Sequence, residues 1–284
     1  MPGLPADNRV SGQAKPGGQG GPGRPSGPAG PLADPVAEAR RLIAAAEQAG
    51  VVLRALGGVA FVLQAPGGAS AMRPPRQVKD IDLAVPRGAG RNVAQVIARS
   101  GYVADEMFNA LRGHRRLLFV DPESGRHVDV FVGEFSMCHD IPLTERLDRD
   151  PHTVPREELL LTKLQIVRRT ANDLNDIYGL LLHHEVGSDA DAPISAPFIG
   201  ALCARDWGLW RTCGLAIEAS LANLPASVLD EAERAVVAAR LGRLTAALEA
   251  EPKSRRWRMR AAVGDRVRWY AEPEEEQGEH DGAG

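Results

Sequence analysis

Two aspartates one residue apart, Asp80 and Asp82, lie in the apolar stretch that follows Lys79. Side chains alternate between the faces of a β-strand, so a strand here would place both carboxylates on one face and Ile81 on the other. Two carboxylates on one face repel each other unless they share a proton or bind a cation. The spacing therefore predicts a divalent-cation site. The alternative is a solvated strand face whose charge Lys79 and Arg76 neutralise.

A third aspartate, Asp129, lies in the later apolar stretch 127–132, on the same strand face as His127 and Phe131. If this strand pairs beside the first, three acidic side chains converge at one end of the sheet. Such an oxygen-rich site without thiolates suits Mg²⁺ or Mn²⁺. Two such ions can activate an attacking hydroxyl and hold a nucleotide triphosphate. The alternative is a surface position for Asp129, because one face of a hairpin is usually wet.

The dipeptide Gly57-Gly58 precedes a short apolar stretch, 59–64, that is typical of a buried helix. Backbone N–H groups at the start of a helix point at anions and bind phosphate oxygens. We therefore expect Gly57 and Gly58 to bind a triphosphate. A plain tight turn without a ligand is the alternative.

A third candidate group is Lys163, one of only four lysines among 34 basic residues. It follows Leu159 by four residues and Leu160 by three, so it shares their apolar side of a helix. An ammonium group there needs an anionic partner or must extend to solvent. Asp173 and Asp176 follow in the next predicted helix, where we interpret them as favourable first-turn charges.

The C-terminal region from Lys253 to Arg268 carries seven basic residues, interleaved with Trp257 and followed by Trp269 and Tyr270. Basic and aromatic side chains together are typical of nucleic-acid binding, which predicts an RNA-binding region. The simpler interpretation, which the sequence favours, is a basic helix face that is solvated or paired with the Glu-rich residues beside it. A further pair of tryptophans, at positions 207 and 210, is three residues apart and indicates core packing.

The first half of the chain reads as a mixed sheet with a few helices. After an N-cap at Asp34, we expect helices over 36–49, 59–64 and 91–100. Strands are expected over 51–56, 80–85, 102–107, 115–120 and 127–132, and residues 121–125 form a strong hairpin signal between the last two.

The pattern changes past residue 150, where six stretches show helical periodicity: 156–169, 174–185, 196–204, 207–224, 227–250 and 254–270. The predicted fold class is α+β, a mixed sheet flanked by helices and followed by a helical C-terminal domain. We predict a sheet domain over 35–150 and a helical domain over 151–271 that selects the acceptor. Residues 1–34, rich in Gly and Pro, and the acidic residues 272–284 are expected to be disordered tails.

Composition narrows the class of protein. A chain of 284 residues with 44% hydrophobic residues and a net charge of −3 is ordinary for a soluble globular protein. No apolar run approaches the length of a membrane span, and the N-terminus has no apolar stretch typical of a signal peptide. The three cysteines lack CxxC spacing, which favours neither disulfides nor zinc and fits a reduced cytoplasm.

The motifs taken together resemble a known family. Gly57-Gly58, then Arg76 and the run from Lys79 through Asp80 and Asp82, then the third aspartate Asp129, resemble the polymerase-β-like nucleotidyltransferase superfamily. The double glycine and the long interval to the first aspartate look closest to the abortive-infection (AbiEii-type) nucleotidyltransferases. Many superfamily members instead have a serine after the first glycine. The resemblance covers roughly residues 50–185.

The resemblance implies roles for the matching positions. Asp80 and Asp82 would ligate two metal ions, and Asp129 would ligate the catalytic ion and help to deprotonate the acceptor. Gly57 and Gly58 would hold the triphosphate, and Lys163 would reach its phosphates. Arg76 and Lys79 would support the site, and Asp173 and Asp176 occupy a region where related toxins carry another acidic residue.

The function implied is Mg²⁺-dependent transfer of a nucleoside monophosphate from an NTP to a hydroxyl of RNA, protein or a small molecule. A toxin of a toxin–antitoxin pair, with an antitoxin protein as partner, shares this chemistry. A catalytically inactive relative that binds nucleotide or a partner is the alternative from a different class. The nucleotide base, the acceptor and the oligomeric state are not encoded in any motif that we recognise.

Overall fold

The computed structural model describes residues 30–66 and 77–272 of the chain. Its first half contains α1 (Pro35–Gln48), β1 (Arg54–Leu56), α2 (Gly57–Gln64), β2 (Ile81–Val85), α4 (Gly90–Arg99), β3 (Val103–Ala104), α5 (Glu106–Arg112), β4 (Arg116–Val120) and β5 (His127–Val132). A short hairpin of β6 (Glu134–Ser136) and β7 (Asp140–Pro142) and the 3₁₀ turn η1 (Thr144–Arg146) lead into the second half.

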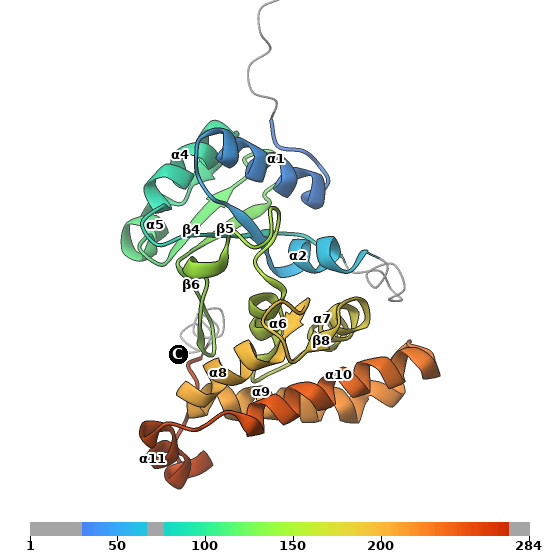
Figure 1. Cartoon of the computed structure of the whole chain (residues 1–284). Coiled ribbons are helices and arrows are strands. Elements are labelled where there is room, and N and C mark those ends of the chain that lie inside the picture. Colours follow the sequence, from blue (N-terminus) through green and yellow to red (C-terminus); the bar gives the residue numbers. More distant parts are fainter. Residues whose placement is uncertain (1–29, 67–76, 273–284) are drawn as a thin grey trace, which may run out of the picture.

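The second half is almost entirely helical (Figure 1). It contains α6 (Arg156–Leu164), α7 (Ala171–His183), β8 (Val186–Gly187), β9 (Ile194–Ser195), α8 (Ala196–Arg205), α9 (Trp207–Asn223), η2 (Leu224–Ala226), α10 (Glu231–Ala250), α11 (Arg255–Val263) and η3 (Gly264–Arg266). This arrangement confirms the predicted fold class, a mixed sheet with flanking helices that is followed by helices.

The central sheet has the strand order β1-β2-β5-β4-β3. β2 and β5 run parallel, whereas the other neighbouring pairs are antiparallel. The outer edge of β1 is covered because Ala55 exchanges backbone hydrogen bonds with His152 and Val154, at 2.8 and 2.9 Å. Covering a sheet edge in this way removes a row of unpaired backbone groups. It also joins the sheet to the segment that precedes α6.

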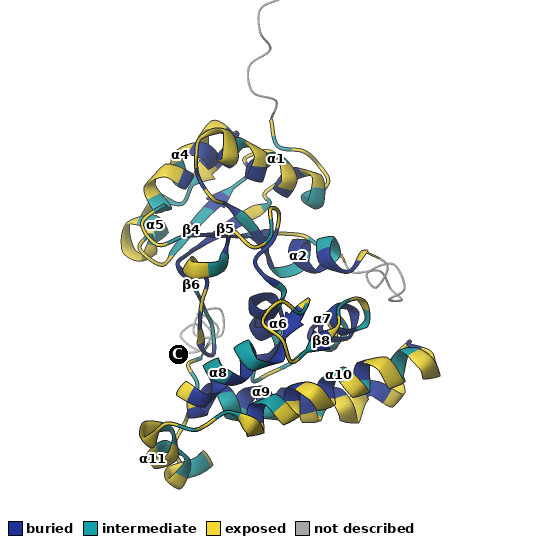
Figure 2. Cartoon of the chain, in the orientation of Figure 1, coloured by how far each residue is buried: buried dark blue, intermediate teal, exposed yellow. Residues whose placement is uncertain are grey.

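One cluster of buried apolar side chains runs from the sheet into the helices of the second half. Gln64, at the end of α2, strengthens this junction through polar contacts. Its side chain bonds to Thr153 at 2.6 Å and to Arg156 at 2.8 Å, and its carbonyl bonds to His184 at 2.7 Å. The predicted boundary near residue 150 therefore lies within a stretch where both halves share one core. Figure 2 shows the buried face of α6 at this junction.

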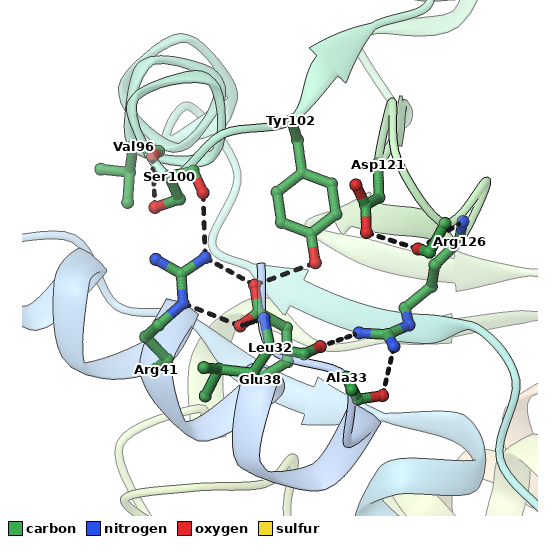
Figure 3. A network of polar contacts seen from close by, with 10 residues as sticks. Leu32, Ala33, Glu38, Arg41, Val96, Ser100, Tyr102, Asp121 and Arg126 are labelled. Carbon is green, nitrogen blue, oxygen red and sulfur yellow. Dashed lines mark hydrogen bonds and ion pairs between the residues drawn. The ribbon is translucent and has the colours of Figure 1, made fainter. Parts of the chain in front are cut away.

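The start of the described chain is fixed by a buried carboxylate (Figure 3). Glu38 is fully buried, yet it is paired with Arg41 at 2.6 Å and accepts hydrogen bonds from the Tyr102 hydroxyl and the Leu32 amide. A buried charge is tolerated when it is paired and hydrogen-bonded in this way. Arg126 also donates to the carbonyls of Leu32 and Ala33. The last residues of the predicted N-terminal tail thus contact the sheet half, while residues 1–29 lie outside the described ranges.

Several predicted elements differ from the structure in length: the strand expected over 51–56 is confined to β1 (Arg54–Leu56), and the helix expected over 156–169 ends at Leu164. Two others differ more, in type or length. The strand expected over 102–107 is only two residues long, because Asp105 caps a helix, accepting a hydrogen bond from the Phe108 amide at 2.9 Å. The helix expected over 254–270 ends at Val263, because Gly264 adopts a φ of 61° that few other residues favour. Within residues 30–66 and 77–272, no helix combines the length and apolar character needed to cross a membrane.

Candidate functional site

The parallel pairing of β2 and β5 places Asp82 directly opposite Asp129. Neighbouring strands lie about 4.8 Å apart, and residues paired in parallel register point to the same face. The two carboxylates are therefore close neighbours. The alternating sequence of β5, with valines on both sides of Asp129, favours a strand and holds Asp129 in a buried position.

The start of α2 lies against this pair. Leu56 pairs with Asp82 across β1 and β2, and α2 begins at the next residue. Gly57 has a φ of 55°, and a Cβ added there would lie 1.9 Å from Oδ2 of Asp82. Only glycine therefore fits between the turn and the carboxylate. No side chain caps the first turn of α2, so its backbone N–H groups, beginning with those of Gly57 and Gly58, lack side-chain acceptors.

The electrostatic environment of Asp82 reflects these neighbours. Burial raises the pKa of Asp82 to about 6, with the charge of Asp129 as the next cause; Arg116 and Lys163 lower the pKa, and Asp80 raises it slightly. All three aspartates that the sequence singles out thus interact electrostatically at Asp82. The two cations keep the pKa from rising further.

Arg116, at the start of β4, is a site residue that sequence reasoning missed. Its Nε donates to Oδ1 of Asp129 at 2.7 Å. The guanidinium lies 5.3 Å from the centre of the Phe131 ring and 5.8 Å from that of Phe108, distances typical of cation–π contacts. In the structure, Leu118 of β4 pairs with Asp129 of β5, and Arg116 lies two residues from Leu118 on the same strand face. The hairpin predicted from the sequence could therefore have indicated that Arg116 lies near Asp129.

Asp80 lies at the edge of this arrangement. It is exposed, and its Oδ1 accepts a long hydrogen bond of 3.3 Å from the backbone N–H of His127, at the start of β5. Lys79 beside it is also exposed. Arg76, the other expected supporting residue, lies outside the described residues. Asp80 therefore has the freedom of a solvent-facing side chain, unlike Asp82 and Asp129.

Lys163 lies beneath α2, 5.6 Å from the centre of the Phe61 ring. Its ammonium forms ion pairs with Asp173 at 2.8 Å and Asp176 at 3.1 Å, both on α7. This confirms that a lysine on the apolar side of α6 needs an anionic partner. Asp173 is also the expected first-turn charge, and it forms a capping box with Thr170 at the start of α7. The same expectation is wrong for Asp176, which lies beyond the first turn because α7 begins at Ala171. Contact of Lys163 with a bound phosphate stays a prediction.

Within the described ranges, no group of three His, Cys, Asp or Glu side chains is arranged to hold a metal ion. Asp82 and Asp129 form an adjacent pair, whereas Asp80 is turned to the His127 amide. This differs from the three-carboxylate convergence that we expected, and metal ligation by the three aspartates stays a prediction. The pair itself fits a hard divalent cation, since such an ion relieves the repulsion that raises the pKa of Asp82.

Comparisons with known proteins give limited guidance. No protein-family model matches the sequence, and no curated protein matches it. Among solved structures, the chain is similar to an antigenic nucleotidyltransferase-like protein from Paracoccidioides brasiliensis. The two share 14% sequence identity with a TM-score of 0.41, over 80% of this chain and 97% of that one. A likeness this distant does not assign a family.

Proposed function

We propose that this protein is a nucleotidyltransferase of the polymerase-β-like superfamily that uses Mg²⁺ or Mn²⁺. It would transfer a nucleoside monophosphate from an NTP to an acceptor hydroxyl. The observation that carries the proposal is the position of Asp82, between the Gly57 backbone and the opposing Asp129. Carboxylates beside an uncapped helix start provide both halves of a site for a metal-bound triphosphate.

Different residues of the chain would have different roles in such a transfer. The acceptor oxygen forms a bond to the α-phosphorus, the bond from that phosphorus to the bridging oxygen breaks, pyrophosphate leaves, and the acceptor proton passes to a carboxylate or to water. Asp82 and Asp129 would hold a divalent ion, which supplies Lewis-acid stabilisation of the phosphate charge. The N–H groups at Gly57 and Gly58 would receive phosphate oxygens, and the buried walls of the sheet exclude water from this side.

Arg116 gives Asp129 a fixed orientation. Its guanidinium lies close to the Phe108 and Phe131 rings and donates to Oδ1 of Asp129. A carboxylate held in one position needs less reorganisation when a ligand binds. Arg116 is thus a positioning residue in the proposed site.

The test is transfer of label from an α-labelled NTP to cellular RNA or protein in the presence of Mg²⁺. Asp82→Asn and Asp129→Asn should each lower transfer by at least about 100-fold, because each removes charge that the site supplies to the reacting phosphates. Asp140→Asn is the matched control, since Asp140 is an exposed aspartate of the same half that pairs with Arg115. Full activity in either site variant would contradict the assignment.

A second candidate is a nucleotide-binding protein of the same fold without turnover. Two observations favour it: Arg116 already neutralises Asp129, and Asp80 is exposed, with its Oδ1 accepting a hydrogen bond from the His127 amide. Calorimetry separates the two candidates. Heat of NTP binding that requires Mg²⁺, with no pyrophosphate released over hours, would support the binding protein and exclude the enzyme.

A further inference from the structure

The C-terminal region concentrates positive charge in a chain that is otherwise slightly acidic. Between Lys253 and Arg268 there are seven basic residues and one acidic residue, a formal charge of +6, whereas the whole chain carries −3. Most of this charge belongs to α11, a helix with four arginines, no acidic residue and no buried residue. The ligand that α11 can bind depends on how the helix is packed and on which of its charges are neutralised.

Tryptophans hold the region against α9. The Trp257 ring packs edge-on to Trp210, with ring centres 5.1 Å apart, and Trp269 packs on Trp207 at 6.1 Å. The Trp269 indole also donates to Thr212 at 3.0 Å. These aromatic side chains therefore anchor the segment by packing against one another. The base-stacking surface that the sequence suggested as one possibility is used internally.

Several of the basic groups are also used internally. Arg260 lies over the Trp207 ring at 4.5 Å and donates to the carbonyls of Gly264 and Val267. Arg268 pairs with Glu272 at 2.8 Å. The one acidic residue of the region, Asp265, pairs with Arg211 of α9 at 2.8 Å, and its charge also interacts with that of Arg260. These groups stabilise the fold of the segment.

The remaining arginines form an exposed set on and beside α11: Arg255, Arg256, Arg258 and Arg266. None of them has an acidic partner among residues 30–66 and 77–272. The exposed surface of α11 is visible at the lower left of Figure 2. Arg255 and Arg256 open the helix with no acidic residue in its first turn. Helices α2, α4, α8 and α9 also lack one there, whereas α1, α5 and α10 have at least one. Positive charge at this end opposes the helix dipole and lowers stability.

We propose that this exposed arginine surface of α11 binds the phosphate backbone of a nucleic acid. Arginine forks match phosphate oxygens, and unpaired arginines held on a rigid helix present them without an acidic competitor. A membrane surface fits less well, because helices that enter lipid turn their aromatic residues outward, whereas Trp257 is turned toward α9.

Recognition through these arginines would be independent of the nucleotide sequence. Contacts from arginines to phosphates depend on salt and carry no sequence information, and the aromatic residues that could stack on bases pack against other aromatic rings. Binding should therefore be similar for RNA of different sequences. That the bound nucleic acid also supplies the acceptor hydroxyl rests on the proposed function, whereas the binding itself does not.

The experiment compares two triple variants of the full chain by fluorescence anisotropy with labelled single-stranded RNA and DNA. One neutralises α11 (Arg255→Ala, Arg256→Ala and Arg258→Ala). The control removes the same charge from exposed arginines of α1 and α4 (Arg40→Ala, Arg91→Ala and Arg99→Ala). At about 0.1 M salt the α11 variant should bind at least about 10-fold more weakly, and the slope of log affinity against log salt should fall by about 2. The control should match the parent protein.

Further variants and controls distinguish loss of RNA binding from misfolding and from failure of the proposed transfer activity. Replacing the same three α11 arginines with lysine should keep most of the affinity, since the charge remains, and thermal unfolding checks that each variant is folded. Asp82→Asn should bind RNA normally even though it loses transfer, so a failure of the proposed function leaves this result intact. Equal loss in both triple variants would overturn the proposal. So would retention on phosphatidylserine vesicles without binding to either nucleic acid.

Discussion

The charged groups of the sheet site and those of α11 lie in opposite environments, partly buried and paired in the first and exposed in the second. At the site, Asp129 is buried and contacts Arg116 at 2.7 Å, and Asp82 lies among two other carboxylates and two cations. On α11, Arg255, Arg256 and Arg258 are exposed and have no acidic partner among the described residues, while the half-buried Trp257 packs against Trp210. Interactions between partly buried charges are strong and little screened, whereas those of exposed charges fall within a Debye length of about 10 Å. The first region is thus suited to holding a small ligand in one position, and the second to attracting a long polyanion.

The largest effect is expected at the contact between Gly57 and Asp82. Gly57→Ala introduces a Cβ at 1.9 Å from the Asp82 carboxylate and also strains a positive φ. Transfer should fall by about 100-fold, because a displacement of about 1 Å at a reacting centre costs that much. Transfer assays and chemical denaturation of the variant measure both consequences.

Gly50→Ala is the matched control, since Gly50 has a φ of 70° and open space around its Cα. It should lose about 1–2 kcal/mol of stability from backbone strain alone and keep its activity. Equal activity in the two variants would show that the close approach of Gly57 to Asp82 has no role in the site.

The next largest effect is expected on the pH dependence of stability, which should report the pair of Asp82 and Asp129. The pKa of Asp82 is about 6 in the folded protein, above its usual value of 3.8, so the folded state holds a proton that the unfolded state has lost. In metal-free protein this contribution is complete below about pH 4 and is lost as the pH rises through 6, by at most about 3 kcal/mol. Urea denaturation at several pH values measures the loss.

Asp82→Asn should remove that part of the pH dependence. Burial also raises the pKa of Glu158, to about 7, which adds a trend of the same direction in both proteins. The difference between the parent and the variant therefore isolates Asp82. If the stability curves of the parent and of Asp82→Asn run parallel from acid to neutral pH, then Asp82 is solvated and has the pKa of an exposed aspartate. The sheet site would then not differ from α11 in how its charges are screened.

The contact between Arg116 and Asp129 should contribute less to the free energy of unfolding than the protonation of Asp82 does. Its contribution should change little as the salt concentration rises. Arg116→Leu leaves a buried carboxylate without its partner, and we expect a loss of about 1–3 kcal/mol. Adding Asp129→Asn should recover most of it, and the double-mutant cycle gives the coupling. A coupling that vanishes as salt rises would place this pair in the same screened regime as the surface arginines.

Much of the site could be predicted because local signals fix the strands. The turn at 121–125 and the alternation around Asp129 predict a strand over 127–132, the bounds that β5 has. That Trp207 and Trp210 pack in the core is likewise confirmed, with ring centres 6.5 Å apart. In both cases the residues that decide the structure are close together in sequence.

The parts that could not be predicted depend on packing between distant segments. The ion pair of Arg116 and Asp129 needs the strand register and the two flanking rings, which no single stretch encodes. Helix α5 was missed because it is only seven residues long, too short for its apolar spacing to be told from that of a strand or loop. None of its residues is buried. The packing of Trp257 depends on Trp210 of α9, which lies more than forty residues earlier.

The smallest effect is expected on α11, where stability and binding should move in opposite directions. Arg256→Glu places an acidic residue in the first turn, as α1, α5 and α10 already have. At low salt it should stabilise α11 by about 0.3–1 kcal/mol, and at about 1 M salt the gain should disappear, because the helix dipole is screened. Hydrogen exchange of the α11 amides measures this local gain. The same substitution should weaken RNA binding, since it reverses a charge on the surface proposed to contact phosphates. A variant that gains helix protection but binds RNA as well as the parent would show that Arg256 is a surface charge without a partner, and that the conflict with the dipole serves no ligand.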